Sequence, residues 1–448
     1  MAIASVVAAL VVAPLSPLTI WFVVVIVPAV AWSVRGLDRA ERNWVIGIVT
    51  VAVVLRVAAV AGLFLSADHS RVAFAAFFGD EEYFIKRSLW LRNVSLGLPM
   101  HMLDLEYAFE PNGRSSFTYF LAVVQALVGS APYGLHLVSI AFYVVGVLWL
   151  YRLVRARFGR MPSICGLTLL LFLPSLFAWS VSVLKESPFV LLGAVSLALG
   201  LRLGSAGSWQ SRLAAAIGFL VVAAVLQTVR RDAGTFVLVA TLSGLTIGWV
   251  VARPRVLLVT ALVAPVLFGL AARLPEVQLQ TYSAIQRAAR QHWGAVVVSP
   301  GTGYKLLDER FYTNVNITSD LRLDETMRFV GRAVASWIAL PRPWDADSRA
   351  AVAYIPEQVV WYVLVLFILI GIPLGLRRDP MLTGLLVAHA ACLAAAAALT
   401  DGNLGTLARH RDLTLPYLVW LGGVGVCDAL VAAQRRLSPR AARALECQ

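Results

Sequence analysis

The sequence predicts an all-α polytopic membrane protein. Hydrophobic residues occupy 59% of its 448 positions and charged residues only 14%, which is too apolar a balance for a soluble globular chain. Runs such as WVIGIVTVAVVLRVAAVAGLFL (44–65) and VLLVTALVAPVLFGLAA (256–272) are about long enough to cross the hydrocarbon core as helices. Because a chain in lipid must satisfy its backbone hydrogen bonds internally, several such runs predict a helical bundle.

Short arginine clusters between the apolar runs orient the predicted spans. The net charge of +13 does not indicate nucleic-acid binding, because the arginines fall in brief connectors of the kind that face the cytoplasm. These basic segments are 35–42, 152–160, 202–212, 253–255, 377–380 and the tail 435–443. The predicted spans are then 44–66, 136–153, 162–181, 187–203, 213–228, 234–252, 256–272, 357–376, 381–399 and 412–434.

At least one more helix is expected before residue 33, which brings the predicted total to about eleven. This N-terminal stretch lacks the basic start of a cleaved signal peptide and is therefore predicted to be membrane-embedded. The apolar stretch 115–129 is short for a crossing and is predicted to lie in the membrane interface. The glycines of GGVGV (422–426) indicate close helix packing.

The polar segments divide the chain into three parts. Residues 1–272 form an N-terminal transmembrane module that includes the first outer loop, 67–135. Residues 273–356 form an extracytoplasmic insert, in which DETMRFVGRAVASWIAL (324–340) predicts an amphipathic helix. Residues 357–448 form the C-terminal transmembrane helices and a short cytoplasmic tail.

Three consecutive acids stand out in the first outer loop, in FFGDEEYFIKRS (77–88). Asp80, Glu81 and Glu82 open a predicted helix, where an N-cap and the helix dipole alone would account for them. Glu82 is also spaced for an ordinary i,i+4 pair with Lys86. Aromatic neighbours on both sides would, however, hold these acids near the bilayer surface, where a carboxylate is suited to accept a proton. Which of the three would be the base is left open.

Other charges interrupt the apolar pattern on the same predicted side. Lys185 and Glu186 separate two apolar runs in WSVSVLKESPFVLL (179–192), either as a tight outer turn or as a functional pair at membrane depth. Two further basic turns follow, QTVRRDAGTF (227–236) and DGNLGTLARHRDLTLP (401–416). Their candidate phosphate ligands are Arg230, Arg231, Arg409 and Arg411. Arginine is the side chain best shaped to fork onto phosphate oxygens.

These pieces resemble the integral-membrane glycosyltransferases of the GT-C superfamily, above all the bacterial relatives of dolichyl-phosphate-mannose protein mannosyltransferase and of lipid A aminoarabinose transferase. The likeness rests on the acidic loop GDEEYF, the following interfacial helix, the two spans of 174–202 with their charged turn, the segment 335–366 and the terminal 402–426. One departure is Tyr83, which follows Asp80 by three residues where family members often place an aromatic four residues on.

The resemblance implies roles for the candidate residues. Asp80 would be the catalytic base with Glu81 beside it, and Glu186 would supply an acid near the acceptor or a metal. Lys185 and the four arginines would bind the donor phosphate. Some relatives use a divalent cation such as Mg²⁺ or Mn²⁺, for which Asp80, Glu81 and Glu186 would be the ligands here.

The sequence therefore predicts an inverting transferase in a bacterial inner membrane with an extracytoplasmic active site. Its partners would be a polyprenyl-phosphate-sugar donor, membrane lipids and a glycan, lipid or protein acceptor, with no nucleic acid. A lipid-linked glycan ligase or polymerase is one alternative. A non-enzymatic transporter or flippase for an anionic lipid-linked substrate is another, although its charges would be expected at the bilayer midplane.

Overall fold

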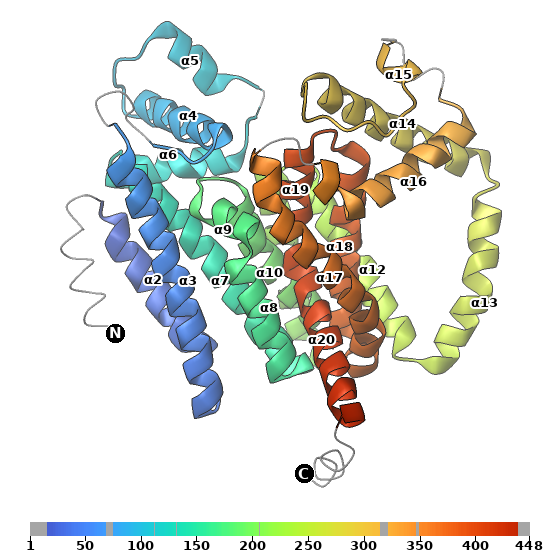
Figure 1. The fold of residues 1–448 in the computed structure, drawn as a ribbon. Helices are drawn as coiled ribbons and strands as arrows, with labels where there is room; N and C mark the ends of the chain where they lie inside the picture. The colour runs from blue at the N-terminus through green and yellow to red at the C-terminus, as the bar shows by residue number, and fades with distance from the viewer. Residues whose placement is uncertain are drawn as a thin grey trace. The chain divides into compact units, whose positions relative to one another are not determined.

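The computed structural model describes residues 16–68, 75–111, 113–130, 132–205, 207–313, 321–345 and 349–437 (Figure 1). Within these ranges the chain is helical throughout, without a strand, so the predicted all-α class is confirmed. The chain forms two compact units, Met1–Leu238 and Val239–Gln448. The boundary between them falls inside a helix. The predicted division of the chain at residues 272 and 356 stays a prediction.

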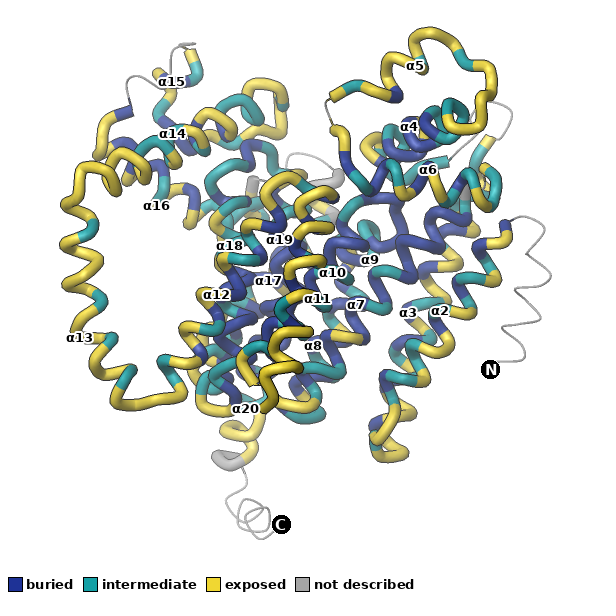
Figure 2. Tube along the Cα trace, turned by 180° about the vertical axis from the view of Figure 1, so that it is seen from behind, coloured by how far each residue is buried: buried dark blue, intermediate teal, exposed yellow. Residues whose placement is uncertain are grey.

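Unit 1 is a bundle of long helices with shorter ones at one end. Its helices are α2 (Leu18–Ser33), α3 (Arg39–Ser66), α4 (Gly79–Ser95), α5 (Met102–Phe109), α6 (Ser116–Val128), α7 (Pro132–Phe158), α8 (Arg160–Phe172), α9 (Pro174–Val181), α10 (Glu186–Ser205) and α11 (Trp209–Val229). The centre of the unit is α7, which packs on α2, α3, α8 and α10 and is mostly buried (Figure 2). The short helices α4, α5 and α6 lie together at one end (Figure 1).

Unit 2 contains the remaining helices, and α12 (Ala233–Val251) connects the two units. They are α13 (Pro254–Ala271), α14 (Pro275–Val297), α15 (Arg310–Thr313), α16 (Leu323–Ala339), the 3₁₀ turn η1 (Pro343–Asp345), α17 (Arg349–Arg378), α18 (Pro380–Thr400), α19 (Leu404–Asp412) and α20 (Leu415–Leu437). The most extensive contact between two helices is that of α17 with α20, and α14 and α16 both pack against α18. No residue of α13 is buried (Figure 2).

Nine helices of the described residues are long and apolar enough to cross a membrane, or ten if the bent pair α8 and α9 is one span. The chain is thus a multi-pass membrane protein, and each of the ten predicted spans has a helical counterpart. The predicted total of about eleven stays a prediction, because α2 is short and residues 1–15 lie outside the described part of the chain. At 13 residues, α6 is shorter than a crossing helix, as the sequence suggested.

The predicted continuous span 162–181 is wrong in one respect, since it is broken into α8 and α9 with a bend of 60°. Pro174 is the first residue of α9. Proline has no N–H to continue the hydrogen-bond ladder and forces the preceding residue out of the helical region. Leu173 accordingly has an extended ψ of 129°.

Contacts between the connectors show which of them lie at the same end of unit 1. The guanidinium of Arg152 donates to the backbone oxygen of Arg35 at 2.7 Å, and Arg155 binds the buried Glu41 at 2.6 Å. The basic connectors 35–42 and 152–160 therefore share one end of the unit, as the arginine pattern predicted. At the opposite end of α7 lie α4, α6 and the turn between α9 and α10.

The insert 273–356 contains more helix than the sequence pattern predicted. The expected amphipathic helix is present as α16, but the 23-residue α14 was missed. Its apolar and polar residues are evenly balanced, so no single stretch stands out by composition. Pro275 at its first turn and Glu276 beside it are the signals that mark its start.

Glycines bring α17 and α20 into backbone contact, which confirms the packing role predicted for GGVGV. A Cβ atom at Gly425 would overlap the carbonyl oxygen of Phe367, and one at Gly371 would overlap the carbonyl oxygen of Leu421. Small residues at such positions let two helices approach closely, which is how helices associate in lipid.

We predict that Gly425→Val destabilises unit 2 by about 1–3 kcal/mol or more, because the added methyl groups must push α17 and α20 apart. Thermal unfolding of the purified protein in detergent measures this. Gly269→Val in α13 is the matched control, since a Cβ there meets nothing within 4 Å. Equal melting temperatures for the two variants would contradict the packing role of Gly425.

Candidate active site

The three acids of the first loop form the first turn of α4, and the helix separates them. Phe78 is extended before the helix, and Asp80, Glu81 and Glu82 then follow the helical path near its positive end. Because successive residues of a helix point about 100° apart, the three side chains have different surroundings. Asp80 is exposed, Glu81 is fully buried, and Glu82 is partly exposed and pairs with Lys86.

The Glu81 carboxylate is an internal anchor. One oxygen accepts the backbone N–H of Val183 at 2.6 Å, and the other accepts that of Phe77 at 2.7 Å. The Nδ1 atom of His136 lies 3.1 Å from Glu81 and 2.8 Å from the carbonyl oxygen of Val181. Since a carbonyl can only accept, Nδ1 carries the proton and serves both acceptors. Glu81 thus ties α4 to the segment that follows α9.

That segment, 180–184, is held by side chains from three other helices. Besides Glu81 of α4 and His136 of α7, Arg56 of α3 donates from Nε to the hydroxyl of Ser180 at 2.7 Å. The Arg56 guanidinium is fully buried between the rings of Tyr143 and Phe177, with centroids at 5.4 and 4.9 Å. Three separate anchors explain why this turn has a defined position although its sequence, SVSVL, carries no turn signal.

The anchored turn delivers Lys185 to the helix that bears Asp80. Its ammonium lies 4.9 Å from the centroid of the Phe84 ring, a cation–π contact. Phe84 is four residues after Asp80 and therefore on the same face of α4. Lys185, more than a hundred residues away in the sequence, therefore packs on the helix whose first turn contains Asp80.

Glu186 belongs to the same turn but is less accessible. It is the first residue of α10 and is only 5% exposed. A carboxylate at a helix N-terminus is favoured by the helix dipole, which gives Glu186 a structural reason to be there.

The basic turn after α11 reaches the same part of unit 1. Val229 is buried in one hydrophobic cluster with Phe84, Val183 and Leu184, and Arg230 is the next residue. The hydroxyl of Thr228 also donates to Ser116 at the start of α6, at 2.9 Å. Arg230 is half-buried beside this cluster.

Arg231, by contrast, is 94% exposed and lies 3.8 Å from the Asp232 carboxylate, so it has the surroundings of a solvated surface charge.

In unit 2, Arg411 is a structural residue, and the predicted phosphate-binding role does not fit its contacts. It is 1% exposed, donates to the carbonyl oxygen of Leu340 at 2.9 Å, and binds Tyr354 and Gln358 at 2.7 Å each. Its guanidinium also stacks 5.0 Å from the ring of Trp361. These acceptors join α16, α17 and α19, so a phosphate would have to displace protein contacts.

Arg409 is partly exposed on α19, and the neighbouring His410 forms a dyad with Asp401. Nδ1 of His410 lies 2.7 and 2.9 Å from the two carboxylate oxygens of Asp401, which is buried at the end of α18. This pair fixes the His410 ring with Nε2 directed away from the carboxylate. Nothing in the sequence pattern of this basic turn connects His410 with Asp401.

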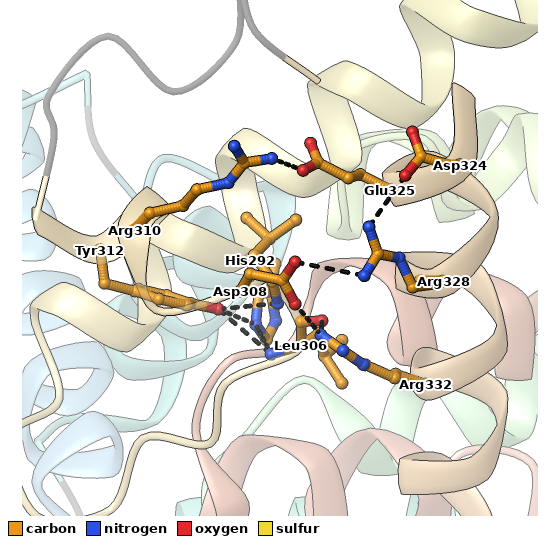
Figure 3. A network of polar contacts seen from close by, with 10 residues as sticks. His292, Leu306, Asp308, Arg310, Tyr312, Asp324, Glu325, Arg328 and Arg332 are labelled. Carbon is orange, nitrogen blue, oxygen red and sulfur yellow. Dashed lines mark hydrogen bonds and ion pairs between the residues drawn. The ribbon is translucent and has the colours of Figure 1, made fainter. Parts of the chain in front are cut away.

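A polar network organises the insert of unit 2 (Figure 3). Its centre is His292 of α14, which is fully buried and donates from Nδ1 to the backbone oxygen of Asp401 at 2.6 Å. Nε2 accepts the backbone N–H of Leu306 at 3.3 Å, and the hydroxyl of Tyr312 lies 3.2 Å away. Burial lowers the pKa of His292, so the ring is neutral.

Ion pairs on the outside of the insert join α16 to the loop that contains Leu306 and Asp308. Asp308 accepts from Arg332 at 2.8 Å and lies 3.5 Å from Arg328, which also binds Asp324 at 2.9 Å (Figure 3). The hydrogen bond from Arg332 is the main reason that the pKa of Asp308 is lowered. Glu325 pairs with Arg310 of α15 (Figure 3). These contacts join the helices and loops of the insert.

The three acids proposed as metal ligands do not form a metal site. Across the described ranges of the chain, no group of three or more His, Cys, Asp or Glu side chains is placed to hold an ion. Both oxygens of Glu81 already accept backbone N–H groups. A site made of Asp80, Glu81 and Glu186 therefore does not fit this arrangement.

His136 is the main residue of this region that sequence reasoning missed. Nothing in the sequence connects His136 with Glu81, which precedes it by 55 positions. No protein-family model, curated protein or solved structure matches the chain.

We predict that Glu81→Gln destabilises the protein by about 1–3 kcal/mol, because an amide can accept only one of the two backbone N–H groups and leaves the other buried without a partner. Glu82→Gln, which removes an exposed ion pair, is the control and should cost less than about 1 kcal/mol. The measurement is thermal unfolding in detergent. Similar shifts for both variants would rule out the anchor role.

A second prediction concerns pH. Because the folded state lowers the pKa of His292, its stabilising contribution is complete above the unfolded value of about 6.5 and is lost as the pH falls below it. Protonated Nε2 would also no longer accept from Leu306. Amide exchange at Leu306, corrected for its intrinsic pH dependence, should accelerate between pH 7 and 5.

His292→Gln should flatten this pH response, because the glutamine side chain cannot be protonated in this range. A response of unchanged size in His292→Gln would assign the effect to another group.

Proposed function

We propose that the protein is an inverting glycosyltransferase that moves a sugar from a polyprenyl-phosphate donor to an acceptor hydroxyl or phosphate group. Two observations support this proposal: the exposed carboxylate of Asp80 in the first turn of α4, and the contact of the Lys185 ammonium with Phe84 of the same helix. Arg230 adjoins the same hydrophobic cluster and adds a second cation. A proton acceptor next to cations is what displacement of a lipid phosphate requires.

In the proposed reaction, Asp80 takes the proton of the acceptor hydroxyl as its oxygen attacks the anomeric carbon. The bond between that carbon and the phosphate oxygen breaks, and its electron pair stays on the phosphate. Lys185 and Arg230 then stabilise the growing negative charge on the leaving polyprenyl phosphate. A single displacement of this kind needs one base and no protein nucleophile, and it inverts the anomeric centre.

The surroundings of the three acids favour Asp80 as the base. Glu81 is buried and already accepts two backbone N–H groups, and Glu82 pairs with Lys86. Glu81 is instead a positioning residue, because it holds both the start of α4 and the turn that precedes Lys185. Glu186 is the first residue of α10 and would also be a positioning residue, because it helps to fix the conformation of the turn that carries Lys185.

The proposal also states which side of the membrane the site faces and includes the basic turn 401–416. We infer that the end of unit 1 with α4 and α6 faces away from the cytoplasm, since the arginine-bearing connectors lie at the opposite end. The role of Arg409 as a ligand of the donor phosphate stays a prediction from the sequence. A spin-label pair at positions 80 and 409, measured by electron–electron double resonance, tests this with a short distance as the expected result.

One observation favours a transporter as the second candidate function. Arg56 is fully buried inside a candidate span and contacts the broken pair α8 and α9. Intramembrane charge and interrupted helices are typical of transporters for anionic substrates. A vesicle flux assay with the same polyprenyl-phosphate sugars separates the two functions, because a transporter moves the intact lipid and a transferase releases polyprenyl phosphate.

We predict that Asp80→Asn lowers sugar transfer by about 10²- to 10⁴-fold, the usual contribution of a general base. The assay follows loss of radiolabelled sugar from a panel of polyprenyl-phosphate hexoses and pentoses in membranes that contain endogenous acceptors. Thermal unfolding should change little, because an exposed charge in the first turn of a helix contributes less than about 1 kcal/mol. Glu82→Gln is the control and should retain the normal rate; an Asp80→Asn enzyme at full rate would exclude Asp80 as the base.

A further inference from the structure

An apolar groove lies at the end of unit 1 opposite to the candidate active site. It has a volume of about 550 Å³ and runs along one face of α3. Its lining residues are Ala40, Asn43, Trp44, Gly47, Ile48 and Val51, with Phe172 from the end of α8. Their spacing of three and four residues puts them on a single stripe of the helix.

The length of the groove matches one leaflet of a bilayer. From Ala40 to Val51 the helix rises about 16 Å, at 1.5 Å per residue. This is roughly half of the ~30 Å hydrocarbon core, so the groove runs from the membrane surface to about the midplane. Trp44, 64% exposed, is near the surface end, where tryptophan usually lies in membrane proteins.

The surface end of the groove is strongly basic. Segments 35–42 and 152–160 contain seven arginines against two acids, and their contacts bring them together at this end. Arg39 is exposed and directly precedes Ala40. Arg160 starts α8 and lies 3.6 Å from Asp38, and its Nε has no acceptor within the described chain.

We propose that this groove is a binding site for one anionic phospholipid. An acyl chain would fill the stripe on α3, and the phosphate would lie against Arg39 and Arg160. A phospholipid is favoured over a second protein chain because the arginines gather at the surface end of the groove, where a lipid phosphate would lie. The proposal does not depend on the transfer reaction, since it concerns a different part of unit 1.

Gly47 offers a sharp test, because the floor of the groove lacks a side chain there. A Cβ at Gly47 meets nothing within 4 Å, so Gly47→Phe should fill the groove without disturbing the fold. Gly62→Phe is the matched control, as Gly62 is on the same helix, equally open and outside the groove. Unchanged melting temperatures would show that both variants fold.

The experiment is native mass spectrometry of the full-length protein in detergent, mixed with phosphatidylglycerol or phosphatidylcholine of identical acyl chains. We expect wild type to retain one phosphatidylglycerol at least about fivefold better than phosphatidylcholine. Gly47→Phe should lose this adduct about tenfold, and Gly62→Phe should keep it. Arg39→Gln combined with Arg160→Gln should lower phosphatidylglycerol retention roughly tenfold, toward the phosphatidylcholine level.

Two results would overturn the proposal. One is equal retention of both lipids by wild type, which would mean only nonspecific solvation. The other is normal phosphatidylglycerol retention by Gly47→Phe, and a changed oligomeric state of that variant would then identify the groove as a protein interface.

Discussion

The buried carboxylate of Glu81 is the interaction on which the proposed site depends. It accepts backbone N–H groups from Phe77, just before α4, and from Val183, just before α10. A carboxylate removed from water is costly unless its oxygens are hydrogen-bonded, and here both are. Satisfying this one group therefore requires the start of α4 and the turn after α9 to keep their positions. Asp80 and Lys185 are neighbours of those two anchored points.

The same turn is secured from inside the bundle by two other polar residues. His136 binds Val181 and Arg56 binds Ser180, so consecutive residues of the chain are held by α7 and α3. Polar contacts in an apolar interior are strong and directional, which makes them suitable for fixing a loop that hydrophobic packing alone would leave loosely specified. Arg56 thus has a structural reason for its position inside a span.

Unit 2 uses arginine and histidine in a comparable way. Arg411 joins α16, α17 and α19 through three acceptors, and His292 links α14 to the end of α18. Of these two residues, Arg411 was predicted to bind phosphate, because a basic turn between apolar runs is typical of a binding site. Their burial shows that many such residues connect helices, whereas the accessible ones, such as Asp80 and Arg409, are those that can meet a substrate.

By itself the sequence determined the all-α membrane class, the places of the ten predicted spans and the common end of the arginine-bearing connectors 35–42 and 152–160. In the hydrocarbon core the backbone N–H and C=O groups must be hydrogen-bonded within the protein, which few structures other than helices achieve. The length and hydropathy of the apolar runs are therefore enough to predict these features. Even the break at Pro174 had a local cause that could be seen in the sequence. Only the tertiary structure decided that Glu81 is an anchor, that Asp80 is exposed and that Arg411 is committed to protein acceptors. Adjacent residues on a helix face different surroundings, and the partners that bury one of them come from segments a hundred residues away.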